Sequence, residues 1–212
     1  KETNDILEKH FGGEISLIKI SKLKKLFDEG IITNQMMKFL RAVKQVHNKS
    51  EKGEFFYKNL MMGTLLFEHS RLNGVEKLVA LAAGCGYPKH LQNALKENDF
   101  WNGLPDENSI GYSMAKKMLI IQSWTYREQY GFNSSVLLPA NLYGPHDNYN
   151  LETSHVIPAL VRKFVEAEEN NSKEVAVWGS GLPSREFLYV EDTAKAILAV
   201  AKNYNESGPL NL

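Results

Sequence analysis

The sequence predicts an α/β protein whose core is a doubly wound parallel sheet. Two short, nearly continuous apolar runs, Lys77–Ala83 and Ser134–Asn141, are typical of strands that are buried on both faces. Longer segments with helical spacing alternate with them. Because ligands of such sheets bind beyond the carboxyl ends of the strands, the first candidates for a site follow the predicted strands. They are Gly84–Tyr87, Asn141–Pro145 and Gly179–Arg185.

Spacing and end signals predict the helices. Phe55–Leu72 carries apolar residues at helical spacing and is closed by Asn73-Gly74, since glycine tolerates the left-handed conformation that ends many helices. A second helix over Tyr112–Tyr130 ends at Gly131 in the same way. The later elements are predicted, in order, as a helix over His155–Glu169, a strand over Glu174–Trp178, a helix over Val190–Asn203 and the beginning of a strand at Pro209–Leu212.

The first stretch, Lys1–Glu54, gives the weakest pattern. A helical spacing runs through Met36, Met37, Leu40 and Val43, and a lysine cluster before it is interpreted as a solvated helix face. A role of the lysine cluster in nucleic-acid binding is the alternative.

The composition excludes several classes of partner. Lys+Arg 25 against Asp+Glu 25 gives a net charge of zero, so the basic footprint of a protein that binds nucleic acid or a membrane surface is missing. The apolar runs are too short to span a membrane. The single cysteine, Cys85, excludes an intrachain disulfide and indicates a reducing compartment. The first residues lack the features of a signal peptide, so a cytoplasmic location is expected.

Several catalytic classes lack their motifs. The sequence contains neither the Gly-x-Ser-x-Gly elbow of serine hydrolases nor a Walker loop. The histidines show no metal-ligand spacing, and with one cysteine a structural zinc site is not expected. No metal is therefore predicted.

Tyr112 and Lys116 lie four residues apart in a predicted helix, so both side chains project from one face. A phenol with its ordinary pKa of ~10 exchanges protons slowly at neutral pH, and a nearby ammonium is expected to lower that pKa. The tyrosine could then act as general acid or base on a carbonyl/alcohol pair. An ordinary exposed helix is the alternative, because Tyr-x-x-x-Lys is common by chance. Its position between two buried strands favours catalysis.

Cys85 and His155 are further candidates. Cys85 comes directly after a predicted strand, where its thiol could reach a ligand, although a buried structural cysteine is the commoner case. His155 opens a predicted helix and could equally be a polar residue without a catalytic role.

Three longer segments carry a family resemblance. Gly111–Lys116 resembles the Tyr-x-x-x-Lys motif of the extended short-chain dehydrogenase/reductases. Pro139–Asn148, with Ser154–Leu160, and Trp178–Asp192 resemble the GDP-L-fucose synthases in particular. The resemblance covers about Phe55–Leu212. It implies a Rossmann-like fold and an NADPH-dependent epimerase/reductase that converts GDP-4-keto-6-deoxy-D-mannose to GDP-L-fucose.

The resemblance also implies roles for individual residues. Cys85 and His155 would exchange protons at C3 and C5 of the sugar, Tyr112 would protonate the oxygen at C4, and Lys116 would hold the cofactor ribose. The residues matched to NADPH contact are Leu81, Ala82, Ala83, Gly84, Tyr112, Lys116, Pro139, Ala140, Asn141, Leu142 and His155. Those matched to the GDP-sugar are Lys163, Trp178 and Arg185.

The chain departs from the family pattern in two places. Ala83 stands where the family has a Ser or Thr that hydrogen-bonds the substrate ketone, and loss of one such donor typically costs on the order of 10²–10³ in rate. Another residue or water could supply the hydroxyl. The family's Gly-x-x-Gly-x-x-Gly fingerprint is absent from the sequence. We therefore expect a polypeptide without the first βαβ unit and most of the C-terminal substrate domain.

The predicted domain division is a partial Rossmann-like nucleotide-binding domain over 1–150 and the start of a substrate-binding region over 151–212, interleaved with the last Rossmann elements. Two alternatives for the function stay open. One is a catalytically impaired nucleotide-sugar-binding homologue, and the other is an enzyme that only epimerises or only reduces a related keto-sugar. A two-fold dimer is also possible, with Met118, Leu119, Ile121 and Trp124 either at its interface or facing the core.

Overall fold

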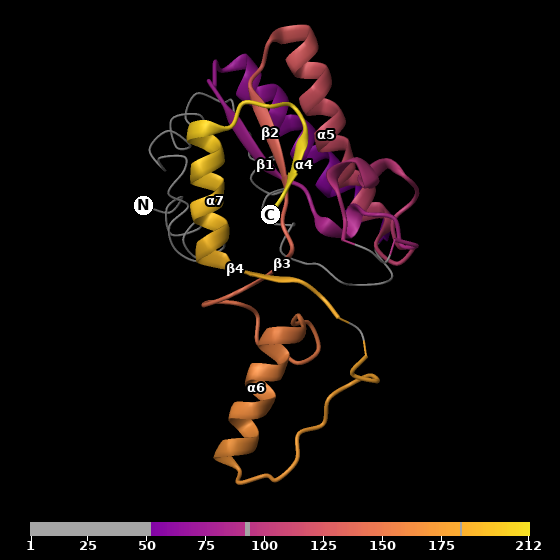
Figure 1. Cartoon of the computed structure of the whole chain (residues 1–212), viewed down its shortest axis with the longest axis vertical. Helices are drawn as coiled ribbons and strands as arrows, with labels where there is room; N and C mark the ends of the chain where they lie inside the picture. Colours follow the sequence, from indigo (N-terminus) through magenta and orange to yellow (C-terminus); the bar gives the residue numbers. More distant parts are fainter. Residues whose placement is uncertain (1–51, 92–93, 183) are drawn as a thin grey trace.

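The computed structural model describes residues 52–91, 94–182 and 184–212 (Figure 1). The pattern seen in Met36–Val43 and the lysine cluster therefore lie outside the described residues. The main body holds a sheet of three parallel strands in the order β1-β2-β5: β1 (Leu78–Leu81), β2 (Ser134–Leu138) and β5 (Pro209–Asn211).

The central strand β2 anchors the core. All five of its residues are buried, because it pairs with β1 on one side and β5 on the other. Ala80 pairs with Val136, and Leu137 pairs with Leu210, so apolar side chains lie side by side across the sheet. Both apolar runs thus contain strands, and β2 is buried on both faces as expected, whereas residues of β1 alternate between buried and half-buried.

Helices cover both sides of this sheet. Figure 1 shows α7 (Val190–Asn203) on one side and α4 (Lys52–Leu72) with α5 (Ile110–Tyr130) on the other. The arrangement confirms the predicted doubly wound α/β fold. Helices α4 and α5 approach closely, because a Cβ at Gly63 would overlap the buried Leu119 Cδ2. No helix in the part of the chain that the structure describes is both long and apolar enough to cross a membrane.

The predicted strand Ser134–Asn141 is divided in two. β2 ends at Leu138, and β3 (Asn141–Tyr143) leaves the main sheet to pair in parallel with β4 (Phe187–Tyr189), a strand that the sequence did not predict. Pro139 lies at the break, where its missing N–H cannot donate to a ladder. Two short 3₁₀ helices, η1 (Gly84–Gly86) and η2 (Glu97–Trp101), were also not predicted.

The predicted strand Glu174–Trp178 is wrong. The segment has no strand pairing and lies, largely exposed, beside α6 (Val156–Glu169) in a smaller lobe below the sheet (Figure 1). A strand needs a neighbour to accept its backbone hydrogen bonds, and within residues 52–212 as described this segment has no such neighbour. The domain boundary at residue 150 stays a prediction, although β5 returns the chain to the main sheet.

The four residues considered for a dimer interface do not share one face. Leu119 is buried against α4, and Trp124 packs on the core while its Nε1–H donates to the Ser207 carbonyl at 2.6 Å. Ile121 is 37% exposed. These four residues therefore do not form one exposed apolar surface. The two-fold dimer stays a prediction.

Phe100 fastens the turn after β1 to the rest of the core. Its ring is fully buried and packs edge-on against the Tyr87 ring, with the two ring centroids 4.9 Å apart. It also occupies the space that a side chain at Gly86 would need. The buried Lys117 ammonium, from α5, donates to the carbonyls of Phe100 and Gly103. Helix η2 is thereby held between the turn and α5.

We expect Phe100→Ala to lower the free energy of unfolding by about 3–5 kcal/mol, because it empties a fully buried aromatic site. Urea unfolding followed by circular dichroism measures the change. Trp178→Ala is the matched control: its ring is 83% exposed, so the change should stay within about 0.5 kcal/mol. Equal losses in the two variants would contradict this account of the core.

Candidate active site

The ends of the parallel strands bring two predicted segments together. Residues 81–84 include the last residue of β1 and the turn after it, and residues 139–142 run from the end of β2 into β3; since β1 and β2 are parallel, both segments leave the sheet at the same edge. The Ala82 N–H donates to the Leu137 carbonyl at 2.8 Å. A Cβ at Gly84 would lie 3.2 Å from the Pro139 carbonyl oxygen, so the two backbones lie close together and leave little room for a side chain.

Tyr112 and Lys116 face this edge from the first turns of α5. Lys116 Nζ donates to the Leu81 carbonyl at 3.2 Å and lies 5.6 Å from the centre of the Tyr112 ring. Phe55, from α4, stacks on the Tyr112 ring with the ring centroids 5.2 Å apart. Both side chains are half-buried. The helical spacing therefore places phenol and ammonium side by side, next to the end of β1.

Burial determines the acidity of this pair. Desolvation, with a smaller contribution from Cys85, raises the pKa of Tyr112 to about 12. Burial also lowers the pKa of the Lys116 ammonium. The expectation that the ammonium would lower the pKa of Tyr112 is therefore wrong for this structure. The Lys116 ammonium donates to a backbone carbonyl, and the loss of water around the phenol is the main cause of the raised pKa of Tyr112.

Cys85 lies in η1, close enough to Tyr112 and Lys116 for its charge to raise the pKa of both. Its side chain is accessible to solvent, while the protein around the sulfur raises the pKa of the thiol by desolvation. A hydrogen bond from Ser113 and the charge of Lys116 act in the opposite direction. Ser113 Oγ lies 3.3 Å from Cys85 Sγ. The structure thus gathers Cys85, Tyr112 and Lys116 at one edge of the sheet.

His155 lies in a different part of the molecule. It is exposed and immediately precedes α6, whose N-terminal end points toward β3 and β4 in Figure 1. The contacts at the sheet edge that involve Cys85, Tyr112 and Lys116 are made by α5, the end of β1 and η1. His155 itself lies at the start of α6.

Two of the three residues matched to the GDP-sugar also meet in that lobe. Lys163 Nζ donates to the Ala176 carbonyl at 2.7 Å and lies 5.0 Å from the centre of the Trp178 ring. Arg185 is exposed on the segment before β4, where it donates to the Ser184 carbonyl at 2.7 Å. Lys163 and Trp178 are therefore brought together, whereas no contact joins Arg185 to them in the part of the chain described.

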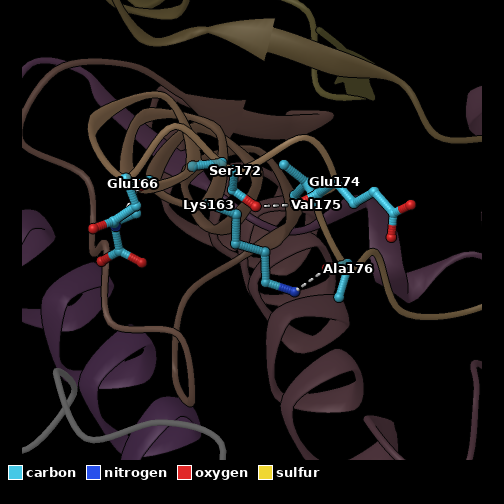
Figure 2. Close-up of a pocket in the computed structure, with 8 residues that line it drawn as sticks. Lys163, Glu166, Ser172, Glu174, Val175 and Ala176 are labelled. Atoms are coloured by element: carbon cyan, nitrogen blue, oxygen red, sulfur yellow. Dashed lines mark hydrogen bonds between the residues drawn. The ribbon is translucent and has the colours of Figure 1, made fainter.

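Beside Lys163 is a shallow pocket of about 330 Å³, shown in Figure 2. It lies between α6 and the extended segment that follows it. The pocket is lined by Lys163, Glu166, Ala167, Asn170, Ser172, Glu174, Val175 and Ala176, and so contains none of Cys85, Tyr112 and Lys116. Within the described residues no group of three or more His, Cys, Asp or Glu side chains could hold a metal ion.

Sequence reasoning missed two residues beside the site. Ser113 is fully buried, and its hydroxyl is occupied by contacts with Cys85. Asn211, in β5, accepts a hydrogen bond from the Tyr87 hydroxyl at 2.6 Å and donates to the Leu95 carbonyl at 3.0 Å. Neither contact has a local sequence signal, because its partners are distant along the chain.

Parallel α/β sheets bind ligands, nucleotides among them, at the carboxyl ends of their strands, and the Tyr112–Lys116 pair lies at that edge. Residues 8–212 match the sequence model of the NAD dependent epimerase/dehydratase family, and the chain belongs to that family. The match confirms the family that the three motif segments indicated.

Individual members of the family are also similar to this chain. The chain is 39% identical over 165 residues to the GDP-L-fucose synthase of Sinorhizobium fredii (strain NBRC 101917 / NGR234), an alignment that covers 78% of this chain and 52% of the relative. The crystal structure of a GDP-L-fucose synthetase from Naegleria fowleri bound to NADP superposes with a TM-score of 0.72 at 31% identity, covering 80% of this chain and 56% of that one. For the GDP-mannoheptose C4 reductase of Campylobacter jejuni with NADP bound, the TM-score is 0.70 at 30% identity, covering 79% and 60%. The chain spans about half the length of the bacterial synthase that it matches.

We expect Cys85 to be alkylated by iodoacetamide with a pH midpoint above the ~8.5 of a free cysteine, because burial disfavours the thiolate. Cys85 is the only cysteine in the sequence, so the label reports on one site. The same chain in concentrated urea provides the unfolded midpoint, and Cys85→Ser should take up no label. A midpoint in the folded chain at or below that in urea would contradict the expected pKa direction.

Proposed function

We propose that the protein carrying this chain is an NADPH-dependent epimerase/reductase that converts GDP-4-keto-6-deoxy-D-mannose to GDP-L-fucose. The observation that carries the proposal is the grouping of Cys85, Tyr112 and Lys116 at the carboxyl edge of the sheet in a member of this family. The similarity to GDP-L-fucose synthases supports the choice of sugar.

The residues present fit one end of the cofactor. Because Gly84 has no side chain, the backbone beside the Pro139 carbonyl stays uncovered. The Lys116 ammonium lies beside the carbonyl of Leu81. Residues 81–84 and 139–142, with Lys116, would hold the nicotinamide and its ribose. Bound NADPH would supply the hydride to C4 of the sugar. The glycine-rich fingerprint that would receive the pyrophosphate is not in this sequence.

Tyr112 would serve as the general acid of the reduction. With a pKa of about 12 its phenol keeps its proton at neutral pH. An alkoxide is a stronger base than even this phenolate, so the proton moves to the oxygen at C4 as negative charge develops there. The raised pKa therefore suits a proton donor, although it would make Tyr112 a poor base in the reverse direction.

Cys85 and His155 would move the protons at C3 and C5. Hydrogens near a ketone are acidic, and inversion needs one group to remove a proton and another to deliver one to the opposite face. Cys85 is solvent-accessible next to Tyr112, and His155 stands at the end of α6 that points toward the main body (Figure 1). Lys163, Trp178 and Arg185 would bind the GDP portion, where a guanidinium suits a diphosphate.

A specific observation favours a second candidate, a reductase of a related GDP-4-keto sugar. Ala83 offers no hydroxyl to the ketone, and a GDP-mannoheptose C4 reductase is also among the similar structures. The comparisons do not favour the other alternative, a catalytically impaired binding homologue.

We expect Tyr112→Phe to lower kcat for reduction by about 10²–10⁴-fold, since it removes the proton donor to the oxygen at C4. The measurement is NADPH oxidation by the whole protein with GDP-4-keto-6-deoxy-D-mannose. Tyr130→Phe, at the far end of the same helix, is the matched control and should retain the parent kcat. No NADPH oxidation by the parent protein would overturn the proposed reduction.

Solvent deuterium incorporation separates the two candidate functions. For an epimerase/reductase, exchange at the two carbons should persist in Tyr112→Phe and be lost, at one or both carbons, in Cys85→Ser and His155→Gln. A reductase of a related keto sugar would show NADPH oxidation without exchange. Mass spectrometry of the recovered sugar in D₂O measures both.

A further inference from the structure

Ser113 follows Tyr112 in α5, yet its side chain is directed at Cys85. Its Oγ lies 3.1 Å from the Cys85 carbonyl oxygen and 3.3 Å from Cys85 Sγ. A third possible acceptor, Ser109 Oγ, lies 3.2 Å from Ser113 Oγ, one helical turn earlier in the chain. The hydroxyl therefore has three acceptors within hydrogen-bonding distance and a single proton to donate.

Burial makes the choice among these acceptors important. Ser113 is 0% exposed, so in this contact protein atoms replace water around the hydroxyl. Hydrogen bonds to a charged acceptor are stronger than those to a neutral one. The hydroxyl proton should thus follow the charge on the sulfur: toward the carbonyl when the sulfur carries its proton, and toward the sulfur when it does not.

We propose that Ser113 is a positioning residue that stabilises both protonation states of Cys85. While Cys85 is a thiol, the Ser113 O–H donates to the Cys85 carbonyl, and Ser113 Oγ can accept the S–H. When the thiol gives up its proton, the Ser113 O–H turns about its C–O bond and donates to Sγ. No bond to carbon changes in this step, and the hydroxyl keeps its own proton throughout.

This inference rests on the proposed function, because a residue that takes up a proton at one carbon and must lose it before the next step needs support in both protonation states. A fixed donor would favour the thiolate alone and make Cys85 a weaker base for taking up a proton. A rotating hydroxyl serves removal and return without a change in backbone position. The direction of the Ser113 contribution to the pKa of Cys85, which is downward, agrees with donation to the thiolate.

The test is the pH profile of Cys85 alkylation by iodoacetamide. Ser113→Ala should move the midpoint to higher pH and slow alkylation at pH 8 by about tenfold, since the hydrogen bond lost from the charged thiolate is stronger than the one lost from the neutral thiol. Ser113→Thr keeps the hydroxyl and should retain the parent midpoint. Ser123→Ala is the matched control: Ser123 is a buried serine of the same helix whose hydroxyl pairs with Ser134 Oγ at 2.7 Å, away from the site.

The outcomes separate this proposal from the proposed function. An unchanged midpoint in Ser113→Ala, or an equal shift in Ser123→Ala or Ser113→Thr, would overturn the role of Ser113. In the whole protein, Ser113→Ala should also slow deuterium exchange into the keto-sugar by about 10–100-fold with little change in KM. If the parent protein shows no exchange, the proposed function fails, while the alkylation profile still decides the role of Ser113.

Discussion

The site depends on the parallel pairing of β2 with both β1 and β5. This pairing buries every residue of the central strand and makes the three strands end at the same edge. Residues 81–84 and 139–142 meet there only because of that shared direction. Helix α5, packed on the sheet through its buried face, brings Tyr112 and Lys116 to the same place.

At this edge, removal of water has more influence on acidity than neighbouring charge. The same burial raises the pKa of Tyr112, raises the pKa of Cys85 and lowers the pKa of Lys116, so each group is shifted toward its neutral form. An isolated phenol, thiol and ammonium would favour different charge states. In a reductase, a protonated phenol is the useful form, because the acid must still hold its proton when hydride arrives.

The turn that carries Cys85 is held from several directions. Phe100 fills the space beside Gly86, Lys117 binds the carbonyl of Phe100, and Ser113 contacts Cys85 itself. Lys117 and Ser113 belong to α5, the helix of the Tyr–Lys pair. The thiol and the phenol are therefore positioned by one helix, although Cys85 and Tyr112 lie on separate segments of the chain.

The sequence by itself determined the alternation of helices and strands, the edge where the site lies, the family, and the shared face of Tyr112 and Lys116. Those features follow from local periodicity and from residues close together along the chain. Only the tertiary structure decided that Tyr112 becomes less acidic, that Ser113 meets Cys85, and that Glu174–Trp178 forms no strand. Burial and strand pairing depend on segments far apart in sequence, so no local pattern could supply them.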